Sequence, residues 1–159
     1  MLMKDSETVN QIERTIVRQT PLSRRMRVAA RWYSQAHWSE HDIDAVLALG
    51  IAVDALIGDR NGLPTSVLAE RFGLLEPNPV SRAERAKEFR ELYSARSAVA
   101  HGSLSSTKID TVFREKLVRQ VCWVARRMIL LDREFHPLND TDFRSIFEDL
   151  RWGSLQWPK

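Results

Sequence analysis

Arg96 occupies a position in the sequence where a helix would be expected to carry an apolar side chain. It follows Phe89, Leu92 and Tyr93 at helical spacing and precedes Val99. At 100° per residue, Arg96 projects only about 20° away from Phe89, in the middle of the apolar stripe. Burying an unpaired charge costs several kcal/mol. The guanidinium therefore needs an acidic partner, or it must lie at the edge of the core, in a cleft or at a subunit interface. The pattern fits a structural salt bridge as well as a cation that binds an anionic group.

His101 follows Arg96 by five positions and directly precedes Gly102. Glycine at this point is typical of a helix end, and histidine is the side chain that exchanges protons near neutral pH. An offset of five places the two side chains about 140° apart on a regular helix. They therefore meet only if the helix unwinds near Ala100 or if a second copy of the motif faces the first. The alternative is that His101 simply ends the helix.

Asp54 is the acidic residue expected to serve Arg96, since it interrupts an otherwise apolar segment. An aspartate can bind a guanidinium through two parallel hydrogen bonds. Two alternatives stay open: Asp54 orients His101, or its helix is rotated so that the carboxylate is exposed. Tyr93 and Ser97 flank Arg96 on successive turns and can add hydroxyl groups to the site, although Tyr93 also fits an aromatic residue at the edge of the core.

Arginine outnumbers lysine by 19 to 5, while the formal net charge is only +3. The planar guanidinium group of arginine can donate two parallel hydrogen bonds to a phosphate, so the excess of arginine favours an anionic partner. Arg24, Arg27 and Arg31 have offsets 0, 3 and 7 and form a basic stripe along one predicted helix. Such a stripe can contact RNA phosphates without reading bases, and the alternative is a solvated helix face.

The segment from Glu91 to Gly102, ELYSARSAVAHG, resembles the Arg-x4-His signature of the HEPN superfamily. Tyr93, Ser97 and the His-Gly pair make it similar to the Apea-like branch of that superfamily. The preceding apolar run IAVDALI, residues 51–57, is similar to the core helix that comes before the motif in that branch. The resemblance covers roughly residues 27–135.

The resemblance implies a small helical bundle that dimerises so that two motifs line one cleft. Many members are metal-independent endoribonucleases that need no cofactor, act as toxins or in antiviral defence, and have an antitoxin or a sensor domain as companion. His101 would then act as general acid or base at the ribose 2′-hydroxyl and the leaving oxygen, and Arg96 would stabilise the phosphoryl charge. Ser97 stands where active members often carry asparagine. The alternative function is a non-catalytic dimerisation or nucleotide-binding module.

The composition indicates one globular domain, because the 159 residues are 43% hydrophobic and 28% charged. A disordered or fibrous chain is thereby excluded. No apolar run approaches the ~20 residues of a membrane span, so no bilayer crossing is expected. The first ten residues lack a secretory core and the single Cys122 cannot form an internal disulfide, which together favour the cytoplasm.

The periodicity predicts an all-α fold, a compact bundle of about five to seven helices. Residues 1–20 should form a peripheral helix, residues 21–152 the bundle and residues 153–159 a tail. Ser39, followed by acidic residues, is expected to cap the central apolar helix. The predicted helices cover residues 6–19, 21–35, 39–57, 65–72, 81–101, 108–135 and 141–152.

Overall fold

The computed structural model describes residues 17, 20–59, 61–102 and 109–158. Within these residues the chain forms six helices and no strand, which confirms the all-α prediction. The helix expected over residues 6–19 falls outside the described residues apart from Val17. The six helices are α2 (Pro21–Trp38), α3 (Asp42–Ile57), α4 (Thr65–Leu74), α5 (Pro79–Ala100), α6 (Thr111–Phe135) and α7 (Asp140–Trp152).

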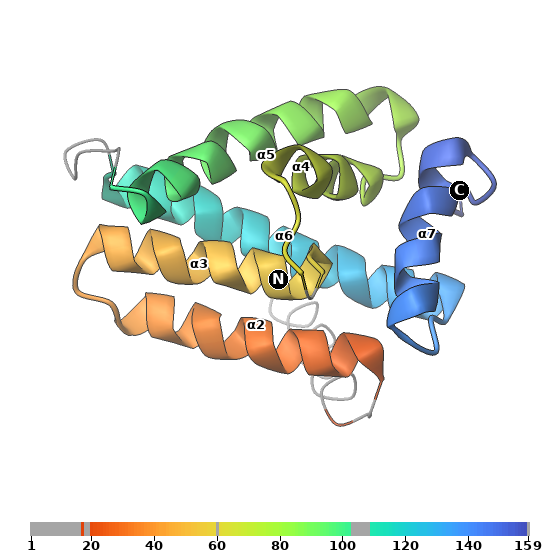
Figure 1. Ribbon diagram of the computed structural model, residues 1–159, viewed down its shortest axis with the longest axis horizontal. Coiled ribbons are helices and arrows are strands. Elements are labelled where there is room, and N and C mark those ends of the chain that lie inside the picture. Colours follow the sequence, from red (N-terminus) through yellow and green to blue (C-terminus); the bar gives the residue numbers. More distant parts are fainter. Residues whose placement is uncertain (1–16, 18–19, 60, 103–108, 159) are drawn as a thin grey trace, which may run out of the picture.

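Helix α3 is the centre of the bundle, as its apolar sequence predicted. It packs against α2 on one side and against α5 and α6 on the other, while α4 pairs with α5 and α7 covers one end (Figure 1). Side chains from nearly every side of α3 are buried, among them Val46, Leu49, Val53 and Leu56. A helix surrounded on several sides buries its whole circumference, which is why its apolar residues form no single stripe.

The predicted cap of α3 is wrong. Ser39 ends α2 instead, and its hydroxyl donates a hydrogen bond to the Gln35 carbonyl at 2.9 Å. His41 takes the N-cap position of α3 without a side-chain hydrogen bond, although Asp42 and Asp44 do lie in the first turn. A serine hydroxyl can donate to a carbonyl of the preceding helix or accept from an amide of the next one. The residue type alone therefore does not decide which of the two helices Ser39 caps.

Several arginines hold the carbonyl groups at helix ends, which have no partners within their own helix. Arg71, only 6% exposed, donates to the Ile57 carbonyl at the end of α3 over 2.8 Å. Arg25 donates to the Gly58 carbonyl (2.9 Å), and Arg114 donates to the Ala36 carbonyl near the end of α2 (2.7 Å). Part of the arginine excess is therefore structural, since a guanidinium also complements the negative end of a helix dipole.

We expect Arg71→Ala to lower the free energy of unfolding by about 2–3 kcal/mol, since it removes a charge-assisted hydrogen bond and leaves the buried Ile57 carbonyl unpaired. Urea denaturation measures the change. The exposed Arg126 of α6 is the matched control, and Arg126→Ala should stay within about 0.5 kcal/mol of wild type. Equal effects of the two substitutions would contradict the capping role.

Two further features concern the rest of the chain. No helix among the described residues is long and apolar enough to span a bilayer. Beyond α7, Trp157 is buried and its Nε1–H donates to the Leu74 carbonyl at 2.9 Å. This bond ties the segment after α7 to the end of α4.

Candidate functional site

Arg96 lies on α5 and packs along α3 at a glycine. A Cβ atom built on Gly50 would lie 2.6 Å from Arg96 Cγ and 2.8 Å from Arg96 Nε. Only glycine leaves room for the guanidinium stem at this point of α3. Sequence reasoning missed Gly50, although a glycine inside an apolar helix carries a cost that calls for a packing reason.

The guanidinium of Arg96 belongs to a three-residue group with Asp54 and Tyr93. Asp54 Oδ2 lies 3.6 Å from Arg96 Nη2, and the Tyr93 hydroxyl donates to Asp54 Oδ1 at 2.5 Å. The Arg96 guanidinium carbon also lies 5.3 Å from the centre of the Tyr93 ring. Of the three alternatives for Asp54, the contact with Arg96 is the one present, but it is a single ion pair rather than two parallel hydrogen bonds, because the Tyr93 hydroxyl occupies the other carboxylate oxygen. We call these residues the Asp54–Tyr93–Arg96 cluster.

The cluster lies at an edge of the bundle, with the Arg96 side chain 22% exposed and that of Asp54 34% exposed. Burial raises the pKa of the Asp54 carboxyl, against the opposing effects of the Tyr93 hydrogen bond and the Arg96 charge. Burial, reinforced by Asp54, also raises the pKa of Tyr93, which keeps its hydroxyl protonated as a donor. The guanidinium is thus positioned by one ion pair and by packing, its Nε atom is buried without a hydrogen-bond partner among the described residues, and part of the side chain remains accessible.

The pH dependence of stability should report on Asp54. Because the folded-state pKa is raised above its ordinary value of 3.8, the contribution of Asp54 is fully present below that pH and is lost as the pH rises through the raised value. The Asp54→Asn variant has no carboxyl group to titrate at this position. Wild type should therefore lose stability relative to Asp54→Asn as the pH rises above the ordinary aspartate value of 3.8, measured by urea denaturation at a series of pH values. If wild type instead gains stability relative to Asp54→Asn as the pH rises, then the charge of Arg96, rather than burial, determines the pKa of Asp54.

Gly50→Ala should displace Arg96. The added methyl group collides with the guanidinium stem, so we expect unfolding to become easier by about 1–2 kcal/mol despite the better helix propensity of alanine. In an Arg96→Ala background the collision is gone, and the same substitution should stabilise the chain by about 0.5–1 kcal/mol. Chemical denaturation of the four proteins measures both changes. An identical effect in the two backgrounds would rule out the contact.

His101 stands at the end of α5 with an exposed side chain. Its backbone N–H donates to the Ser97 carbonyl at 3.1 Å, and Gly102 adopts the expected left-handed conformation with φ +67°. The helix runs without interruption to Ala100, so the unwinding that would bring His101 beside Arg96 is absent. The backbone keeps the two residues about 140° apart around the helix axis. One chain alone does not place them in one pocket.

The remaining predicted residues are distributed over two regions. Ser97 is half-buried on α5, between Arg96 and His101. Arg24, Arg27 and Arg31 are exposed on α2, which α3 separates from α5 (Figure 1). Of these three, Arg24 lines a surface hollow of about 250 Å³ together with Asp54. The basic stripe therefore approaches the cluster at Arg24.

The chain matches no protein-family model, no curated protein and no solved structure. The expectations drawn from the HEPN resemblance accordingly rest on the motif residues and on the geometry around them.

Proposed function

We propose that the chain is a metal-independent endoribonuclease of the HEPN type, with Arg96 and His101 as its catalytic residues. The imidazole takes the proton of a ribose 2′-hydroxyl, whose oxygen then bonds to the adjacent phosphorus as the bond to the 5′-oxygen breaks. The imidazolium returns this proton to the leaving 5′-oxygen, which yields a 2′,3′-cyclic phosphate and a 5′-hydroxyl. Arg96 stabilises the negative charge on the phosphoryl oxygens.

The observation that supports this proposal best is the Asp54–Tyr93–Arg96 cluster. Electrostatic catalysis needs a charge that is already oriented before the substrate arrives. The ion pair with Asp54 and the packing against Gly50 position the guanidinium, and the Arg96 side chain remains 22% exposed. An exposed imidazole follows at the end of the same helix.

The active form in this proposal is a homodimer. The separation of about 140° between Arg96 and His101 is bridged when the α5 ends of two chains face each other. RNA is the substrate, with Arg24, Arg27 and Arg31 as additional phosphate contacts. A cytoplasmic toxin or antiviral-defence effector, held by an antitoxin or a sensor domain, is the role that fits such an activity.

A non-catalytic dimerisation or nucleotide-binding module is the second candidate. The observation that favours it is the engagement of Arg96 itself, which is paired with Asp54 and packed on Gly50. In that case the ion pair fastens α5 to α3, and His101 only ends the helix.

Incubation of the purified protein with total RNA in the presence of EDTA tests the proposal. Fragments with 2′,3′-cyclic phosphate and 5′-hydroxyl ends are expected from wild type, and none from an Arg96→Ala/His101→Ala double variant purified in the same way. A contaminating ribonuclease would cut RNA in both preparations, so the double variant serves as the control for contamination. Intact RNA after incubation with the dimeric wild-type protein would overturn the nuclease proposal and leave the module.

A further inference from the structure

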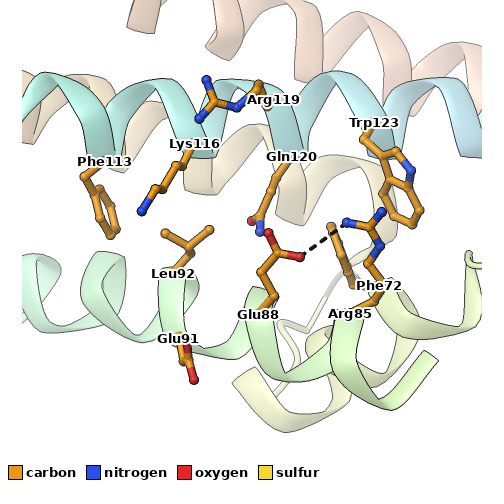
Figure 2. A pocket seen from close by; sticks show the side chains of 10 residues that line it. All are labelled: Phe72, Arg85, Glu88, Glu91, Leu92, Phe113, Lys116, Arg119, Gln120 and Trp123. Atoms are coloured by element: carbon orange, nitrogen blue, oxygen red, sulfur yellow. Dashed lines mark hydrogen bonds and ion pairs between the residues drawn. The ribbon is translucent and has the colours of Figure 1, made fainter. Parts of the chain in front are cut away.

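A groove of about 540 Å³ lies between α5 and α6, and the proposed nuclease uses none of its residues (Figure 2). Helix α5 packs mainly on α4 and α3, while α6 packs mainly on α3, so the two helices do not close on each other here. The side chains of Leu92 and Phe113 are half-buried and give the groove apolar walls toward one end. Trp123 and Phe72 lie at the other end (Figure 2).

Gln120 carries a buried amide that has no partner. The residue is only 6% exposed, and neither its Oε1 nor its Nε2 atom forms a hydrogen bond to the described part of the chain. Figure 2 shows the side chain leaving α6 and pointing across the groove toward α5. Buried polar groups are nearly always paired, because an unpaired donor or acceptor loses its hydration without compensation. The unpaired amide therefore indicates a ligand that supplies both partners.

The amide specifies the kind of partner. It presents one acceptor and one donor group side by side, which complements a planar edge that carries a neighbouring donor and acceptor. Nucleobase edges have this arrangement, and glutamine recognises bases through it. The apolar surfaces of Leu92 and Phe113 beside the amide suit the flat faces of such a ring.

The charges around the groove suit an anionic group attached to that ring. Arg85 is engaged by Glu76 (3.7 Å) and Glu88 (3.3 Å) and lies 5.5 Å from the centre of the Trp123 ring. Lys116, one helical turn before Gln120, is exposed and forms no ion pair with any described residue. Arg119 makes only an exposed pair with Glu115 on its own helix. Figure 2 shows Lys116 extending from α6 toward α5 and Arg119 on the opposite side of α6, so Lys116 is the cation available to a phosphate in the groove, while Glu88 and Glu91 lie on the α5 wall.

We propose that the groove between α5 and α6 binds a nucleotide, with the base edge on the Gln120 amide and the phosphate near Lys116. The nucleotide is either free or one unit of a single-stranded RNA. This inference is independent of cleavage at Arg96 and His101.

Isothermal titration calorimetry with the four ribonucleoside monophosphates and a 2′-O-methylated tetranucleotide tests the proposal. The methylated strand cannot be cut through its 2′-oxygen, so binding is read apart from any cleavage. Wild type should bind at least one of these probes, and Gln120→Leu should weaken that binding tenfold or more, because the paired base edge is then left unsatisfied. Gln120→Leu should melt at the same or a higher temperature than wild type, since leucine needs no partner.

Three variants make the result specific. Lys116→Ala changes an exposed residue, so it folds normally and should weaken binding severalfold. Gln35→Leu removes an exposed glutamine of α2, and His136→Asn changes an exposed residue at the end of α6, away from both proposed sites; both should bind as wild type does. Tighter binding of the tetranucleotide identifies RNA as the source, and tighter or equal binding of a monophosphate identifies a free nucleotide. The proposal is overturned if wild type binds no probe, or if Gln120→Leu binds as wild type does.

Discussion

His101→Ala should reduce RNA cleavage by at least about 100-fold and leave the melting temperature unchanged. The loss is large because general acid–base catalysis by one positioned imidazole contributes about 10²–10⁴-fold. Stability is unaffected because the His101 side chain is exposed and forms no hydrogen bond within the described residues. The rate of cleavage of a fluorescent oligoribonucleotide and a thermal melt measure the two quantities.

His136 provides the matched control. It is also exposed and also ends a helix, but it lies after α6, in a left-handed conformation with φ 48°. His136→Asn removes an imidazole and keeps a residue that tolerates this backbone, so cleavage should be unchanged. Equal cleavage by wild type and His101→Ala would remove the histidine from the mechanism, whatever the source of the activity.

Mixing two inactive variants should restore cleavage. The regular α5 helix holds Arg96 and His101 of one chain about 140° apart, so in the proposed dimer a complete site combines Arg96 of one chain with His101 of the other. A heterodimer of Arg96→Ala and His101→Ala chains then contains one intact site and one doubly defective site. After equal mixing and exchange of subunits, half of the dimers are mixed, and the rate should reach about a quarter of the wild-type rate.

Subunit exchange needs its own control, because a dimer that does not exchange would give a false negative. Co-expression of the two variants under different affinity tags and purification through both tags isolates the mixed dimer. This preparation should cleave RNA at about half the wild-type rate per dimer. No activity in the isolated mixed dimer would show that the two residues do not act across the interface.

The Asp54–Tyr93–Arg96 cluster and the groove between α5 and α6 differ in how directly they indicate a ligand. Asp54 and Arg96 satisfy each other in part, so their geometry can be explained by the α3–α5 contact alone as well as by the proposed catalysis. Gln120 satisfies nothing within the described chain. A buried amide without a partner has no comparable structural benefit, which is why the groove supports a ligand on geometry alone.

Local sequence patterns were sufficient for the helices and for one contact of the site. The apolar spacing predicted helices at 21–35, 65–72, 81–101, 108–135 and 141–152, and their ends shifted by only a few residues. Gly102 ended α5 as predicted, because a left-handed helix end depends on neighbouring residues alone. The pairing of Asp54 with Arg96 followed from two charged residues that each interrupt an apolar stripe.

Only the tertiary structure decided how those helices meet. Gly50 made room for Arg96, Tyr93 took the second oxygen of Asp54, and Arg71 reached the end of α3. It also left Gln120 facing a groove between two helices that do not close on each other. Periodicity states which face of a helix is buried, whereas the distance, crossing and rotation between helices arise from side chains far apart in the chain packing together.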